Sequence, residues 1–280
     1  MTGDEVYRAL QSRARSFGAK TGKATPTEAY LTRHLLESFL QRLTLTEHRN
    51  NFILKGGILL AIYGVRRPTK DVDSAAVNIA VTEDQIAQVV NAVAAVPADD
   101  GVEFLLDTLT ITEIREEAEY SGLRMKVKAT IGPWTGVTAW DISTGDPIVP
   151  GPQQVTLPRL LGDDIRLAGY RPETTIAEKG VTILQRGIRS TRWRDYVDIV
   201  QLFRTYNVDA GVLRDAAEAV AAYRRVSLGP VSPLLVGYGE VAQPKWAAWR
   251  RKEWVDDISE ELLDDQIALV AGHLDPVFAD

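Results

Sequence analysis

The chain has 280 residues, of which 45% are hydrophobic and 25% charged, and its formal net charge is -6 at pH 7. This balance is typical of a globular protein with a sizeable core, and the acidic sum argues against nucleic-acid binding over the whole surface. The absence of cysteine excludes disulfides, thiolate zinc sites and a cysteine nucleophile, and three scattered histidines argue against a histidine-built metal site. Any metal would have oxygen ligands, which points to Mg²⁺ or Mn²⁺.

The N-terminal segment is polar and typical of a helix, without the apolar stretch of a signal peptide. No apolar run approaches the roughly 18 residues that a membrane span requires. We therefore expect a cytoplasmic protein with no membrane partner.

In the first half of the chain, short apolar stretches alternate with helix start signals. Thr25 and Glu28 have the spacing of a capping box, and apolar residues then repeat at helical spacing through Leu43. Residues 52–55 predict a strand that turns on glycines into a helix. A second strand is expected over residues 71–81, followed by a helix that Thr82 would cap.

The remaining pattern divides into strands and then helices. Alternation of apolar and polar residues predicts strands over residues 102–106, 108–116, 123–131 and 136–142. Residues 145–158 are rich in proline and glycine and are expected to form a linker. Helical spacing follows over residues 172–189, 191–206 and 209–223, then a connection over 229–244 and one or two helices over 246–274. We expect an α+β protein with a mixed sheet, divided into an N-terminal domain (1–150) and a mostly helical domain (151–280) that contributes to the active-site cleft.

Three features of the first half of the chain fit a site for phosphoryl transfer, namely a glycine pair, an acid pair and a single acid in a later strand. Gly56 and Gly57 open a predicted helix, where glycine allows close backbone approach to a triphosphate and unpaired N–H groups face it. Asp71 and Asp73 are two residues apart in a predicted strand, so both carboxylates lie on one face. Asp141 lies between apolar residues in a later strand and would join them if the two strands are neighbours. Divalent cations would relieve the repulsion of these three acids and support phosphoryl transfer.

A second group of residues belongs to the helical half. Lys179 leans toward the buried side of its predicted helix and is suited to bind a β- or γ-phosphate. Asp195 and Asp198 share one helix face, and a structural ion-pair role for them is the alternative to a catalytic one. Arg194 belongs to a basic stretch that could bind the triphosphate or an RNA backbone, as could Arg67 and Lys70 before Asp71.

These segments together resemble a known family. LKGGILLAIYGVRRPTKDVDS, AEYSGLRMKVKATIG, the run 141–146 and TTIAEKGVTILQRGIRSTRWRDYVDI are similar to the AbiE-type (AbiEii or MenT-like) nucleotidyltransferase toxins, within the DNA polymerase β superfamily. The resemblance covers about residues 30 to 255. It departs at Ser74, where an apolar residue commonly follows the acid pair.

The resemblance implies a polymerase β-like core and a metal-dependent toxin of a bacterial or phage-defence toxin–antitoxin system. Such a toxin transfers NMP from an NTP to RNA, foremost the tRNA 3′ end, and has a cognate antitoxin. By position, the residues that match the family's functional residues are Gly56, Gly57, Asp71, Asp73, Lys179 and Asp195. Asp141 matches the strand acid of the superfamily. The alternatives are nucleotidylation of a small molecule or a protein hydroxyl, and a degenerate module that only binds nucleotide.

Two further features have functional and structural interpretations. Trp246, Trp249 and Trp254 surround a basic triplet and could stack on an unpaired RNA end, although tryptophans at helical spacing are more often core. The Thr69 hydroxyl is expected on the same side as Asp71, where a phosphate would compete with the triphosphate. The simpler interpretation is that Thr69 caps a turn.

Overall fold

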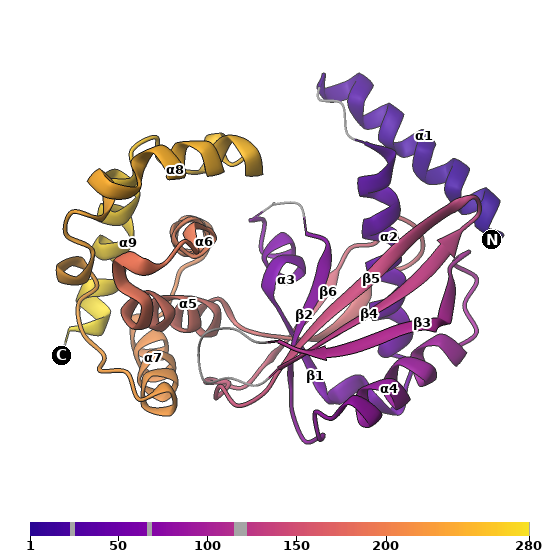
Figure 1. Ribbon diagram of the computed structural model, residues 1–280, viewed down its shortest axis with the longest axis horizontal. Helices are drawn as coiled ribbons and strands as arrows, with labels where there is room; N and C mark the ends of the chain where they lie inside the picture. The colour runs from indigo at the N-terminus through magenta and orange to yellow at the C-terminus, as the bar shows by residue number, and fades with distance from the viewer. Residues whose placement is uncertain (23–25, 66–68, 115–121, 280) are drawn as a thin grey trace. The chain divides into compact units, whose positions relative to one another are not determined.

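The computed structural model describes residues 1–22, 26–65, 69–114 and 122–279 (Figure 1). Its strands are β1 Phe52–Lys55, β2 Asp71–Ala76, β3 Glu103–Glu113, β4 Gly122–Ile131, β5 Trp134–Ser143, β6 Gln153–Leu157 and β7 Ile165–Gly169. Its α-helices are α1 Gly3–Thr21, α2 Thr27–Leu43, α3 Gly56–Ile62, α4 Glu83–Ala95, α5 Pro172–Arg186, α6 Trp193–Thr205, α7 Ala210–Arg224, α8 Tyr238–Glu253 and α9 Leu263–Phe278.

The strands form one mixed sheet in the order β3-β4-β5-β2-β1-β7-β6. The pairs β2–β5 and β1–β7 are parallel, whereas β1–β2, β3–β4 and β4–β5 are antiparallel. The mixed sheet with flanking helices confirms the expected α+β class. In the described part of the chain, no helix is both long and apolar enough to span a membrane.

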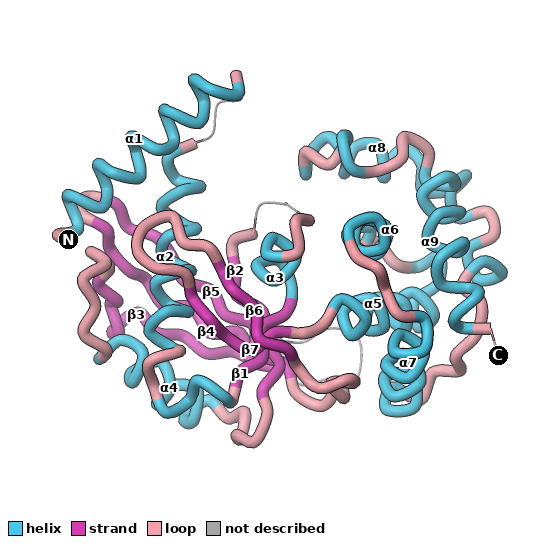
Figure 2. The backbone as a smooth tube through the Cα atoms, turned by 180° about the vertical axis from the view of Figure 1, so that it is seen from behind, coloured by secondary structure: helices cyan, strands magenta, loops and turns pink. Residues whose placement is uncertain are grey.

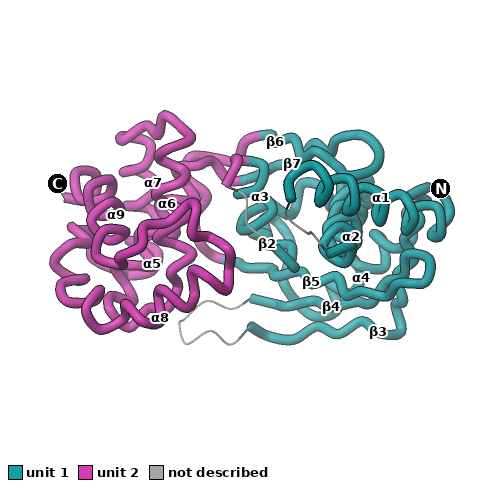
Figure 3. Tube along the Cα trace, turned by 90° about the horizontal axis from the view of Figure 1, so that it is seen from above, with its two compact units in different colours: residues 1–62, 68–144, 154–169 teal, residues 63–67, 145–153, 170–280 magenta. Residues whose placement is uncertain are grey.

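The chain divides into two compact units, shown in separate colours in Figure 3. The first unit comprises Met1–Ile62, Pro68–Thr144 and Gln154–Gly169, and holds most of the sheet together with α1 to α4. The second comprises Tyr63–Arg67, Gly145–Gln153 and Tyr170–Asp280, and holds α5 to α9. The sheet therefore draws on strands from both sides of residue 150.

One face of the sheet in the first unit is covered by α1, α2 and α4, which pack on β3 to β5 (Figure 2). Strand β4 alternates as predicted, and its covered residues are Leu123, Met125, Val127, Ala129 and Ile131. Trp140 of β5 is fully buried and makes edge contacts with Phe39 and Phe52, at ring-centroid distances of 5.2 and 4.5 Å. Its indole N–H donates to the Ser74 hydroxyl at 3.1 Å. The serine that follows the acid pair is thus a buried partner of the core tryptophan.

The core of the second unit lies among its helices. Trp193 contacts Trp246 edge-on at 6.3 Å, and Trp246 stacks on Trp249 at 5.3 Å. Because Trp246 is fully buried, it is a core residue and is closed to stacking on RNA. Trp254, by contrast, is 86% exposed.

Several sequence expectations differ from the observed elements. Strand β2 ends at Ala76 rather than near residue 81, because Asn78 takes a left-handed conformation with φ 56°. The two strands expected over 102–116 form the single β3, whose register with β4 shifts between Leu105 and Thr110. The expected linker 145–158 contains β6, which pairs at the sheet edge.

Helix α8 begins at Tyr238, inside the stretch expected to be a connection. Gly237, at φ 75°, turns the chain into this helix. Pro244 lies inside it and removes one ladder hydrogen bond. Burial of Ala242 and Trp246 on the same helix offsets that loss. The N-terminus of α2 shows no side-chain cap, and Thr25 of the predicted capping box lies outside the described residues.

Candidate active site

A row of charged residues crosses the face of the sheet that α1, α2 and α4 leave uncovered, and α3 packs against part of this face. Asp73 of β2 lies in register with Asp141 of β5, which is the neighbouring parallel strand. On its other side Asp73 faces Lys55 of β1, and Asp141 faces Arg124 of β4. Residues in register on adjacent strands project to the same face. The order across the sheet is therefore Lys55, Asp73, Asp141 and Arg124, with two acids between two cations.

Asp71 joins this row from the same strand as Asp73. It lies two residues earlier in β2 and is in register with Ala139 of β5. The Thr69 hydroxyl donates to the Asp71 carboxylate at 3.0 Å, so it lies on the side that the sequence predicted. The structure thus brings Asp71, Asp73 and Asp141 to one face, as the alternation in the two strands indicated.

The glycine pair packs directly against these residues. Gly56 has φ +67°, and a Cβ atom placed on it would lie 1.9 Å from the Asp73 Oδ2 atom. A Cβ atom on Gly57 would lie 2.5 Å from the Thr69 Oγ1 atom. The Gly57 N–H also donates a long hydrogen bond of 3.4 Å to Asp73. The two glycines are therefore required by the close approach of α3 to the acidic strand, whatever else they bind.

The row and Asp71 together bring three acids and two cations to one face of the sheet. Burial, together with the charges of Asp71 and Asp141, raises the pKa of Asp73 to about 6, although Lys55 opposes the shift. Arg124 makes a bidentate ion pair with Asp141, with the Nε–Oδ1 distance at 2.6 Å. This pair raises the pKa of Arg124 above its ordinary value. Asp141 thus has Arg124 as a cationic partner on β4, and Asp73 lies among two acids and Lys55.

The side chains do not yet form a complete cation cage. In the parts of the chain that are described, no three carboxylate or imidazole side chains converge on one point. The reason lies in Asp141, whose two oxygens both face Arg124. The donor set nevertheless fits Mg²⁺ or Mn²⁺, because all three candidates are carboxylates.

The second unit contains a separate buried charge cluster. The Lys179 ammonium of α5 lies 2.5 Å from Asp195 Oδ1 and 2.9 Å from Asp198 Oδ2, both on α6. Arg192 lies 2.9 Å from the other Asp195 oxygen. Burial alone would raise the pKa of Asp195, but Lys179 and Arg192 lower it to about 2. Asp195 and Asp198 therefore share one face of α6, as the sequence predicted. Lys179 binds both acids on that face, so the three residues form an ion-pair network between α5 and α6.

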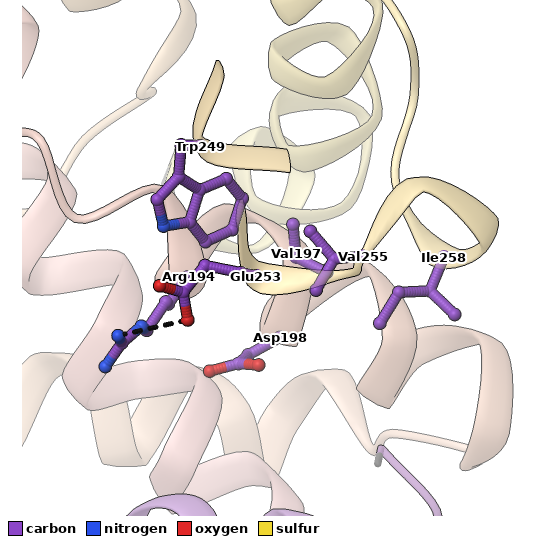
Figure 4. A pocket seen from close by; sticks show the side chains of 7 residues that line it. All are labelled: Arg194, Val197, Asp198, Trp249, Glu253, Val255 and Ile258. Carbon is purple, nitrogen blue, oxygen red and sulfur yellow. Dashed lines mark hydrogen bonds and ion pairs between the residues drawn. The ribbon is translucent and has the colours of Figure 1, made fainter. Parts of the chain in front are cut away.

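Arg194 pairs with Glu253 of α8 at 3.3 Å. Both residues line a small pocket with the Asp198 side chain below them (Figure 4). The other lining residues are Val197, Trp249, Val255 and Ile258. Of the remaining candidates, Lys70 is exposed, and Arg67 lies outside the described residues.

Two members of the charged row, Lys55 and Arg124, were not among the sequence candidates. Lys55 directly precedes the glycine pair, and Arg124 starts the polar side of the β4 alternation. The alternation places Arg124 on the uncovered face, but only strand pairing reveals that its neighbour is Asp141.

Comparison with known proteins gives a consistent result. A profile of the family described as "Nucleotidyl transferase AbiEii toxin, Type IV TA system" matches residues 38–268. No curated protein sequence matches the chain. The structure resembles that of JHP933 from Helicobacter pylori with a TM-score of 0.52, at 14% identity over 91% of this chain and 94% of that one. A putative nucleotidyltransferase from H. pylori aligns with a TM-score of 0.49, at 13% identity over 89% and 94% of the two chains. Since the family profile spans most of the chain, including the glycine pair, the charged row and the Lys179 cluster, the protein belongs to the AbiEii family of nucleotidyltransferase toxins.

Proposed function

We propose that this toxin uses a divalent cation to transfer NMP from an NTP to an RNA acceptor, with the tRNA 3′ end as the acceptor that blocks translation. Its family implies an NTP substrate and a cognate antitoxin. The observation that carries the metal-dependent part is the parallel register of Asp73 with Asp141, with Asp71 two residues from Asp73. This register gathers acids from strands that are far apart in sequence on one uncovered face.

The residues fit Mg²⁺ or Mn²⁺. Asp71 and Asp73 are oxygen donors on one face. Burial, together with the charges of Asp71 and Asp141, raises the pKa of Asp73 to about 6, and a bound cation would favour its charged form. Such an ion would supply charge neutralisation for the triphosphate and the departing pyrophosphate. Asp141 would complete the donor set or act as a base once Arg124 shares or releases it.

The reaction is a substitution at the α-phosphorus of the NTP. The acceptor hydroxyl oxygen forms a bond to this phosphorus while the bond to pyrophosphate breaks. Asp141 accepts the hydroxyl proton, and pyrophosphate leaves with the electron pair of the broken bond. Arg124 is suited to hold the Asp141 carboxylate in position.

The remaining candidates are assigned to the nucleotide. Gly56 and Gly57 would let the phosphates approach the backbone at the start of α3, and Lys70, Arg67 and Lys179 would contribute positive charge. Arg194 would do so by exchanging Glu253 for a phosphate. Asp195 would serve by holding the Lys179 ammonium.

The test is incubation of the purified protein with total RNA and each labelled NTP, with and without Mg²⁺. We expect one NTP to label RNA of tRNA size only when the cation is present. The Asp73→Asn variant should lose labelling, whereas the Asp107→Asn variant, with the same change of charge at an exposed β3 position, should retain it. Label in a protein or small molecule, or label that survives chelation, would contradict the proposal.

A further inference from the structure

Strand β4 carries a line of positive charge away from the acidic row. Arg124, Lys126 and Lys128 alternate with the buried residues Met125 and Val127. All three cations therefore project from the uncovered face of the sheet, and both lysines are exposed. Same-face residues on a strand are about 6.6 Å apart, so the line extends about 13 Å from Arg124. We call these three residues the β4 ladder.

The residues directly opposite the two lysines on the adjacent strands are uncharged. Lys126 lies in register with Ala139 on β5 and Thr110 on β3. Lys128 lies between Val137, which is 45% exposed, and Leu105. Within the described ranges, no ion pair involves either lysine, so their charges are available to a ligand.

The ends of the ladder differ in character. At one end Arg124 pairs with Asp141 of the acidic row. At the other end, one step beyond Lys128, Thr130 lies between Thr135 and Glu103 in the strand registers. An anionic chain bound along β4 would therefore begin beside two threonines and Glu103 and end beside the acids proposed for transfer.

We propose that the β4 ladder binds the phosphate backbone of single-stranded RNA and directs its end to Asp141. The inference rests on the proposed function, in which RNA is the acceptor. The ladder spacing is comparable to that of adjacent phosphates in an extended strand, and lysine binds phosphate as a point charge without reading sequence. The exposed Val137 offers an apolar contact that a ribose or base can use but inorganic polyphosphate cannot. We favour an extended RNA over a folded protein as the partner, because a flexible backbone can follow the line of cations along one strand.

The test measures RNA binding directly, apart from transfer. The probe is a short fluorescein-labelled single-stranded RNA, and its anisotropy is followed with the full chain over a range of KCl concentrations. Lys126→Gln/Lys128→Gln should weaken binding about tenfold and reduce the salt slope by about 1.4, which corresponds to two phosphate contacts. Lys126→Arg/Lys128→Arg should bind like the wild type.

A matched control separates the ladder from net charge. Arg13→Gln/Lys20→Gln removes the same two charges from exposed positions of α1 and should leave RNA binding unchanged. Unchanged binding in the Lys126→Gln/Lys128→Gln variant would overturn the inference, as would equal weakening in the α1 control or no binding by the wild type. Failure of the proposed function has a different signature, namely no Asp73-dependent label in RNA from the wild-type enzyme.

Discussion

Replacing Asp73 by asparagine should stabilise the metal-free protein while abolishing its activity. Burial and two neighbouring acids raise the pKa of Asp73 from its ordinary 3.8 to about 6. A carboxyl group whose pKa is higher in the folded state costs stability as pH rises through the interval between the two values. Above pH 6 the cost levels off at about 3 kcal/mol, since each pKa unit corresponds to about 1.4 kcal/mol. Asparagine carries no charge and retains a carbonyl that can accept the Gly57 N–H, so it avoids most of this cost.

The measurement is urea denaturation followed by far-UV circular dichroism, with a chelator present. At pH 7.5 we expect Asp73→Asn to unfold with a free energy about 1–3 kcal/mol higher than the wild type, and at pH 3.5 we expect the two to converge. Added Mg²⁺ should stabilise the wild type and leave the variant unchanged, because binding to the folded state alone raises its stability. The control Asp107→Asn, at an exposed position of β3, should show neither effect. If Asp73→Asn is less stable than the wild type at pH 7.5 without metal, the conclusion that the charged Asp73 carboxylate destabilises the fold is refuted.

Three further predictions concern the residues around the two charge clusters. Gly56→Ala should destabilise the fold by about 1–3 kcal/mol and stop transfer, because it places a side chain on a left-handed backbone, against the Asp73 carboxylate. The control Gly151→Ala has open space around it, so it should change neither the urea midpoint nor the transfer rate. Lys179→Met should lower the free energy of unfolding by about 3–5 kcal/mol, because it removes the cation from two buried acids. Lys179→Met/Asp195→Asn should regain only part of that stability, because Asp198 stays buried without Lys179, and it should not regain transfer. Recovery of transfer would restrict Lys179 to a structural role. Thr69→Glu should transfer nucleotide more slowly than Thr69→Val, because the added carboxylate would lie beside Asp71. Equal rates in the labelling assay would show that negative charge at Thr69 does not regulate the enzyme.

Much of the local structure follows from residue patterns in the sequence. The alternation through Leu123–Ile131 identifies β4 and separates its buried from its exposed side, because side chains on a strand project with a period of two. The spacing of Asp71 and Asp73 places both carboxylates on one face for the same reason. The order of glycine pair, acid pair and later strand acid also predicts the family, which the family match over residues 38–268 confirms.

Only the tertiary structure decides which strands and helices are neighbours. The parallel pairing of β2 with β5 brings Asp141 to Asp73, and no local pattern states which strand pairs with which. The same pairing reveals Lys55 and Arg124, whose roles depend entirely on the residues beside them. Packing of α5 on α6 likewise gives Lys179 two acidic partners. The physical reason is that propensity and periodicity act over a few residues, whereas register is selected by burial across the whole sheet.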